Sequence, residues 1–124
     1  MKKVIVSEKA PGAIGPYSQA IEANGMVFVS GQLPIDATTG LMPESVANQT
    51  RQSLENMRNI LEAAGLTMDK VVKTTVFLHD MSAFADMNSV YATYFNGNFP
   101  ARSAFAVKEL PKGALVEIEC IAVR

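Results

Sequence analysis

The chain has 124 residues, of which 48% are hydrophobic and 19% are charged, so its length and composition fit one folded domain over residues 1–124. Its 11 basic and 12 acidic side chains give a net charge of −1, which argues against a nucleic-acid or membrane-surface protein because phosphate groups are bound by basic patches. The single cysteine, Cys120, excludes an internal disulfide and a metal site built from several cysteines.

No targeting or membrane-spanning pattern is found in the sequence. Glu8 interrupts the N-terminal segment before an apolar region of signal-peptide length can form. No stretch approaches the roughly 20 apolar residues that cross a bilayer. We therefore expect a soluble, cytoplasmic protein.

Three strands are predicted in the first part of the chain, over residues 3–7, 18–23 and 26–30. Prolines and glycines at positions 11–16 place a loop after the first strand, because proline fixes φ and glycine accepts unusual backbone angles. Asn24 and Gly25 connect the second strand to the third. This dipeptide suits a tight hairpin turn with positive φ, so these two strands are expected to pair.

A long amphipathic helix is predicted over residues 46–64. Its apolar stripe recurs every three or four residues and comprises Val46, Thr50, Leu54, Met57, Leu61 and Ala64. Ser45 is the expected N-cap and Gly65 the expected C-terminal stop. The rest of the chain predicts a strand over 71–78, a helix over 82–95, and strands over 103–108 and 115–123.

The last strand has two different faces. Val116, Ile118, Cys120 and Ala122 form an apolar face that should meet the helices. The other face places Glu117 and Glu119 among large apolar groups, which a monomer would leave in water. We therefore predict an α+β fold, with a six-stranded sheet, two helices on one face, and an open face that packs in a homo-oligomer.

Cofactor motifs are missing from the sequence. The glycines at positions 12 and 15 fit neither the dinucleotide fingerprint nor the phosphate-binding loop. His79 is the only histidine, so one chain assembles neither a Ser-His-Asp triad nor a multi-histidine metal site. We expect no metal and no cofactor.

Arg102 and Glu117 are the candidates for chemistry. Arg102 follows Pro100 at the start of a strand, and its planar guanidinium suits a carboxylate held by two parallel hydrogen bonds. Pairing with Glu117 or Glu119 across an interface fits the spacing equally well. Glu117 has the chemistry of a general base that activates water, and pairing with a cation is its simpler interpretation.

Other polar residues are candidates for lining a pocket. Tyr17 and the pair Ser30 and Gly31 stand at the same outer end of the predicted hairpin, so they are expected to line one cleft. For Tyr17 alone, packing is the commoner role. Asn88 and Tyr91 lie three positions apart on the second predicted helix, where such residues are more often surface or packing groups.

The chain resembles the RidA family, also called the YjgF or endoribonuclease L-PSP family, nearly from end to end. PARS at 100–103 is the most diagnostic segment. The other matching segments are AIGPYSQA at 13–20, VSGQLP at 29–34, KTTVFL at 73–78, MNSVY at 87–91, YF at 94–95, LP at 110–111 and GALVEIE at 113–119.

The resemblance implies a chorismate-mutase-like fold assembled as a homotrimer, with the sheets facing inward and three clefts between subunits. It also implies cofactor-free hydrolysis of 2-aminoacrylate, 2-aminocrotonate and their 2-imino acid tautomers to 2-oxo acids and ammonia, which protects pyridoxal-phosphate enzymes from reactive enamines. By resemblance, Arg102 holds the substrate carboxylate, Glu117 is associated with the attacking water, and the pocket is lined by Tyr17, Ser30, Gly31 and Asn88.

One position departs from the family pattern. Many relatives carry cysteine two residues after the arginine, whereas this chain has Ala104, which excludes thiol chemistry there and leaves the expected deaminase residues in place.

Two other functions remain open: a regulatory trimer that senses a small carboxylate or binds a protein, and a ribonuclease or translation inhibitor. Because the chain is slightly acidic and has no histidine pair, ordinary acid–base RNA cleavage is disfavoured.

Overall fold

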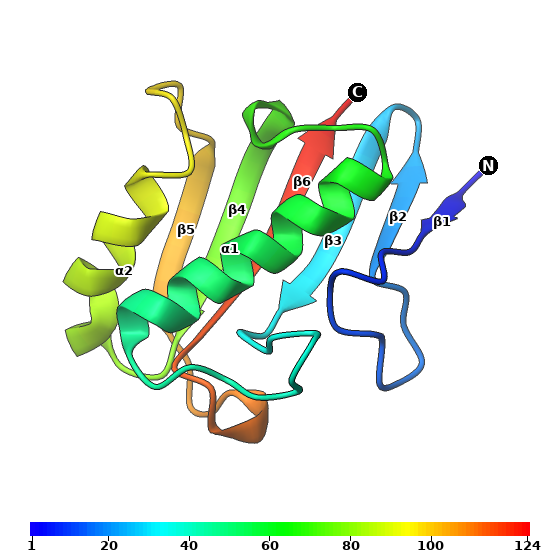
Figure 1. Cartoon of the computed structure of the whole chain (residues 1–124). Coiled ribbons are helices and arrows are strands. Elements are labelled where there is room, and N and C mark those ends of the chain that lie inside the picture. Colours follow the sequence, from blue (N-terminus) through cyan, green and yellow to red (C-terminus); the bar gives the residue numbers. More distant parts are fainter.

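The computed structural model describes residues 1–124. Its centre is one six-stranded mixed sheet in the order β1-β2-β3-β6-β4-β5, with α1 and α2 on one face (Figure 1). This confirms the α+β fold expected from the sequence. The strands are β1 Lys3–Ile5, β2 Ala20–Ala23, β3 Met26–Gln32, β4 Val71–Leu78, β5 Ala101–Ala106 and β6 Val116–Val123, and the helices are α1 Val46–Ala63 and α2 Phe84–Ala92.

Connections and pairing follow from local sequence signals. Asn24 and Gly25 have φ values of 51° and 73°, as the tight turn between β2 and β3 requires. The strands β4 and β5 are parallel neighbours joined through α2, and every other neighbouring pair is antiparallel. A helical crossover is the usual connection between parallel strands.

The first helix begins and ends where the sequence indicates. The Ser45 hydroxyl accepts a hydrogen bond of 3.0 Å from the backbone N–H of Asn48, which satisfies one of the free donors of the first turn. Gly65 follows the helix with φ of 77°, a left-handed angle that glycine adopts without steric cost.

The second helix is shorter than the predicted range 82–95. A 3₁₀ turn over Met81–Ala83 precedes α2, and the Asp80 carboxylate caps that turn at the N–H of Ser82. At the other end, the N–H and hydroxyl of Thr93 both donate to the carbonyl of Val90. These bonds tighten the last turn and end the helix at Ala92.

The predicted strands also shift at their ends. The first is shorter than 3–7 and the second shorter than 18–23, because β2 pairs with β1 only through the three residues Ala20, Ile21 and Glu22. The strand expected at 103–108 lies at Ala101–Ala106, because its pairing with Lys73–Leu78 of β4 sets its register. The third strand extends beyond position 30 to Gln32 through an irregularity in its pairing with β6.

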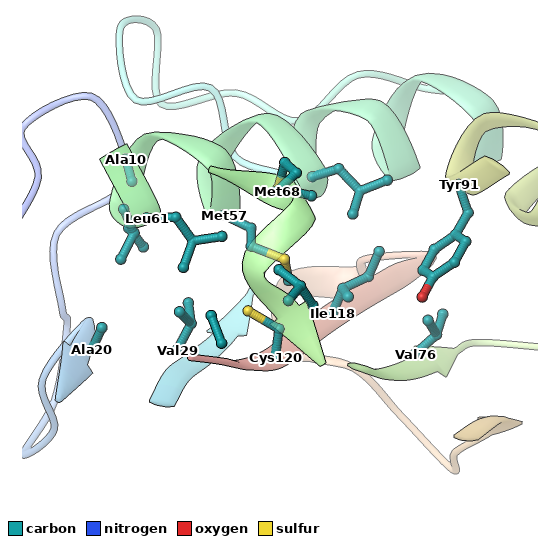
Figure 2. Close-up of a cluster of buried hydrophobic side chains, with 14 of the residues drawn as sticks. Ala10, Ala20, Val29, Met57, Leu61, Met68, Val76, Tyr91, Ile118 and Cys120 are labelled. Atoms are coloured by element: carbon teal, nitrogen blue, oxygen red, sulfur yellow. The ribbon is translucent and has the colours of Figure 1, made fainter. Parts of the chain in front are cut away.

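The hydrophobic core lies between the two helices and the sheet, and Figure 2 shows the part of it under α1 together with Tyr91 of α2. Alternate residues of β6 are buried against the helices, including Ile118 and Cys120, as its sequence pattern predicts. The opposite, open face leaves Phe28 of β3 and Phe105 of β5 more than two-fifths exposed. Neither α1 nor α2 has the length and apolar character of a bilayer-crossing helix.

Candidate functional site

A cavity of about 720 Å³ opens beside the ends of β3 and β6. Four of the six residues expected at the site line it, and we call them the cavity group: Tyr17, Ser30, Gly31 and Glu117. Asp36, Lys112 and Glu119 add charged side chains to its wall. Tyr17 and the pair Ser30–Gly31 therefore line one cavity, as expected from the hairpin, and their part in binding stays a prediction.

A β-bulge places Ser30 and Gly31 at the cavity. Val29 pairs with Cys120 and Gln32 pairs with Ile118, so two residues of β3 lie opposite the single residue Glu119 of β6. Such an insertion bends the strand and changes where its side chains point. The Ser30 hydroxyl donates to the carbonyl of Ser18 at 2.6 Å, which ties β3 to the segment that carries Tyr17.

Glu117 lies against the backbone of Gly31. A Cβ atom added at position 31 would stand 2.8 Å from Oε2 and 3.0 Å from Cδ of Glu117, which is closer than real Cβ contacts. Burial raises the pKa of the Glu117 carboxyl, and the negative charge of Glu119 raises it further. The site therefore holds a half-buried carboxylate with an increased affinity for a proton.

Arg102 lies apart from this cavity, in a socket formed by α2. Its Nη1 donates to Oδ1 of Asn88 at 2.7 Å and lies 3.9 Å from Sδ of Met87. Its Cζ is 4.8 Å from the ring centre of Tyr91 and 5.5 Å from that of Phe84. Arg102 and Asn88 form the second part of the expected site, which we call the arginine group.

Within one chain, Arg102 and Glu117 lie on opposite faces of the sheet. Arg102 pairs in register with Thr74 of β4, which is fully buried on the helix side. Glu117 pairs with Phe77 of β4, whose ring packs edge-on against the exposed ring of Phe105. Because Thr74 and Phe77 are three residues apart in one strand, their side chains point to opposite faces. One chain therefore does not bring the two groups to the same point.

Comparison with known proteins shows the family. The family model described as Endoribonuclease L-PSP matches residues 7–124. The chain belongs to the endoribonuclease L-PSP family. This is the RidA/YjgF family that the sequence motifs indicate.

Members of the L-PSP family resemble the chain over its full length. A RutC family protein of Pyrococcus horikoshii is 54% identical over 125 residues, which cover 100% of this chain and 99% of the relative. A 2-iminobutanoate/2-iminopropanoate deaminase of Salmonella typhimurium is 51% identical over 127 residues, covering 100% and 99%. The crystal structure of E. coli TdcF with bound serine is 46% identical, with a TM-score of 0.95 and 98% of each chain covered.

Two buried amides that support the site in this L-PSP protein were not singled out from the sequence. Gln19 receives a bond from the N–H of Ser7 at 2.8 Å and donates to the carbonyl of Pro11 at 2.8 Å, which fixes the loop that carries Tyr17. Asn56 of α1 donates to the carbonyls of Leu33 and Ile35 at 3.1 and 2.9 Å, and both carbonyls belong to segments of the cavity wall.

A pattern in the sequence indicates that Asn56 is buried on one face of its helix. Gln49, Ser53, Asn56 and Ile60 recur at spacings of four, three and four residues, and all four are buried. That is the spacing of one helix face. Most buried polar side chains have hydrogen-bond partners, so polar residues on this face indicate loops packed against the helix. Gln49 and Asn56 donate to loop carbonyls in this way, whereas the buried hydroxyl of Ser53 has no partner.

Proposed function

We propose that this chain hydrolyses 2-iminobutanoate, 2-iminopropanoate and their enamine tautomers to 2-oxo acids and ammonia. The Salmonella relative carries the name of this activity. We place the reaction in the cytoplasm and assign residues 1–124 to one RidA-like domain. There the enzyme would remove reactive enamines that damage pyridoxal-phosphate enzymes, without a metal or cofactor of its own.

The observation that carries the proposal is the free edge of the Arg102 guanidinium. Its Nη1 is bonded to Asn88, and Nε and Nη2 have no hydrogen-bond partner in the chain. Those two nitrogens form one edge of the planar guanidinium, which suits two parallel hydrogen bonds to a carboxylate. Serine, which TdcF binds, carries a carboxylate on the carbon next to its nitrogen, as the proposed substrates do.

Glu117 supplies the second requirement, a group that takes a proton from water. The carboxylate is half-buried, has no cation within salt-bridge distance in its own chain, and faces the cavity. Its raised pKa makes it a better proton acceptor than an exposed glutamate while it is ionised. Tyr17, Ser30 and Gly31 line the same cavity and would surround the side chain and nitrogen of the substrate.

The reaction then needs only the protonated imine and water. Glu117 removes a proton from a water molecule while the oxygen of that water bonds to C2 of the substrate. The carbon–nitrogen double bond then becomes a single bond. Glu117 returns the proton to nitrogen. As the C2–N bond breaks, Glu117 takes the proton of the C2 hydroxyl, which becomes the carbonyl of the 2-oxo acid, and this proton passes to the released ammonia, which leaves as an ammonium ion. Fixing the carboxylate and the water in place can supply roughly 7–11 kcal/mol in favourable cases.

Arg102 and Glu117 lie on opposite faces of a single sheet. The arginine group and the cavity group can therefore act on one substrate only if two copies of the chain share the site. We propose the homotrimer that the family resemblance implies, with the open faces inward. In it the arginine group of one copy meets the cavity group of the next. The exposed rings of Phe28 and Phe105 on the open face support burial of that face between copies.

The activity is tested by coupling the protein to a threonine or serine dehydratase and following the decay of the enamine. Wild type should accelerate the decay. Arg102→Ala should abolish the acceleration while the oligomer stays intact in size-exclusion chromatography. A wild type no faster than buffer would overturn the proposal and favour a sensor of small carboxylates.

The shared site is tested by mixing two inactive variants, Arg102→Ala and Glu117→Gln, through unfolding and refolding. In a symmetric trimer with equal random mixing, about one quarter of the sites combine an intact arginine with an intact glutamate. The mixture should therefore recover about one quarter of the wild-type activity. A mixture as inactive as its components would show that the two residues do not meet across an interface.

A further inference from the structure

The side chains that hydrogen-bond the Arg102 guanidinium or present an aromatic ring to it come from one face of α2. They are Phe84, Met87, Asn88 and Tyr91, at intervals of three, one and three positions. Residues at i, i+3, i+4 and i+7 lie along one stripe of a helix. The guanidinium is therefore held by a single rigid element.

Tyr91 is the member of this socket that is tied most firmly to the sheet. Its side chain is only 4% exposed, and Figure 2 shows its ring at the edge of the core, directed toward Val76 of β4. Its hydroxyl is bonded to Oγ1 of Thr74 at 2.7 Å, and Thr74 has no exposed surface.

Thr74 is also the residue that pairs with Arg102 in the β4–β5 register. The three residues therefore form a closed arrangement. The backbone of Arg102 lies beside that of Thr74 in the sheet. Thr74 forms a hydrogen bond with the hydroxyl of Tyr91, and the ring centre of Tyr91 lies 4.8 Å from Cζ of Arg102. An aromatic face at this distance attracts a guanidinium and also limits its rotation.

We propose that Tyr91 is a positioning residue: its ring, fixed by the hydroxyl bond to Thr74, sets the plane of the Arg102 guanidinium so that the free Nε–Nη2 edge faces the substrate carboxylate. This inference rests on the proposed function, because it assigns the carboxylate as the ligand of that edge. Asn88 restrains the same guanidinium from its other side, through Nη1.

The expected effect is on substrate binding more than on the chemical step. A loosened guanidinium still carries its charge but meets the carboxylate in fewer productive orientations. Tyr91→Leu removes the ring and should raise KM roughly tenfold, with a smaller change in kcat. Tyr91→Phe keeps the ring and loses the hydroxyl bond, so its KM should fall between those of Tyr91→Leu and wild type.

Phe95→Leu is the matched control for general damage to this part of the core. Phe95 is buried and its ring centre is 4.9 Å from that of Tyr91, but its ring is not one of the two that lie against the Arg102 guanidinium. If Tyr91 acts through Arg102, Phe95→Leu should lower stability without raising KM. Equal increases of KM in the two leucine variants would overturn the inference.

A second measurement does not depend on turnover. The Nε–Hε signal of Arg102 can be identified in a proton–nitrogen NMR spectrum because it disappears in Arg102→Lys. Tyr91→Leu should move this signal toward the position of a free arginine, and Phe95→Leu should leave it unchanged. An unchanged signal in Tyr91→Leu would overturn the positioning role even in an active protein. An inactive wild type with the signal shifted as expected would instead overturn the proposed function alone.

Discussion

Gly31 leaves the space that the carboxylate of Glu117 occupies. Oε2 of Glu117 would stand 2.8 Å from a Cβ atom at position 31, and the Cγ atom would stand at 3.3 Å. A methyl group there requires either the carboxylate or the bulged segment of β3 to move. The small residue at position 31 and the acid at position 117 therefore form one unit, although 86 positions separate them in the sequence.

Gly31→Ala should lower kcat by roughly 10- to 100-fold, because a displacement of about 1 Å can cost two orders of magnitude in rate. The measurement is the steady-state rate of enamine decay. Gly12→Ala is the matched control, since Gly12 also lines the cavity and a Cβ atom there has no neighbour within 4 Å. A Gly31→Ala variant with wild-type kcat would show that the position of Glu117 does not limit catalysis.

The pH dependence should report the ionisation of Glu117. Its pKa is raised by burial first and by Glu119 second. A general base acts when deprotonated, so kcat/KM should fall as the pH is lowered through this raised pKa. Glu119→Gln removes the neighbouring negative charge and lowers the pKa of Glu117, so the acid limb of the profile should move to lower pH.

Glu62→Gln on α1 is the control for the pH experiment, because Glu62 is exposed and does not line the cavity. Its profile should match that of wild type. An acid limb that stays in place in Glu119→Gln would mean that the charge of Glu119 does not reach Glu117 in the assembled protein.

Local sequence patterns predict the elements of this fold well. The turn at Asn24 and Gly25, the cap at Ser45 and the alternation along β6 each depend on neighbours in the chain. The sequence predicts the ends of the helices and strands less accurately, because these ends depend on pairing with residues far away in the chain. The end of β5, for example, follows from its register with β4 and not from its own residues.

The assembly of the site was harder to predict. Motifs identified both Arg102 and Glu117, but spacing along the chain does not reveal that the two lie on opposite faces of the sheet. That relationship depends on the insertion of β4 between β5 and β6 and on the register of both pairs. The bulge at Ser30 and Gly31 is likewise a property of the pairing of β3 with β6.

Asn56→Ala should destabilise the protein by about 2 kcal/mol, because the carbonyls of Leu33 and Ile35 each lose a hydrogen-bond donor. The free energy of unfolding is measured in urea. Asn59→Ala on the same helix is the control: Asn59 donates to the carbonyl of Lys9 in an exposed bond, so its loss should change stability by less than about 0.5 kcal/mol. Equal losses of unfolding free energy in the two variants would show that burial does not increase the contribution of the Asn56 hydrogen bonds to stability.

Cys120 should be unreactive in the folded protein. Burial raises the pKa of its thiol to about 12, and the side chain is only 3% exposed on the helix side of β6. The thiolate, which is the nucleophile, is therefore scarce at neutral pH and out of reach of reagents. A maleimide reagent should label Cys120 only after unfolding in urea, and the folded protein should keep its activity during the treatment.

The same reasoning predicts the behaviour of Cys120→Ala. The variant should retain the activity of wild type, because the thiol lies in the core and not in the cavity. Its loss of stability should be about 1 kcal/mol, since a buried sulfur is removed from a packed site. Rapid labelling of the folded wild type with loss of activity would contradict this account. It would mean that β6 opens to solvent often enough to expose the face that carries Cys120.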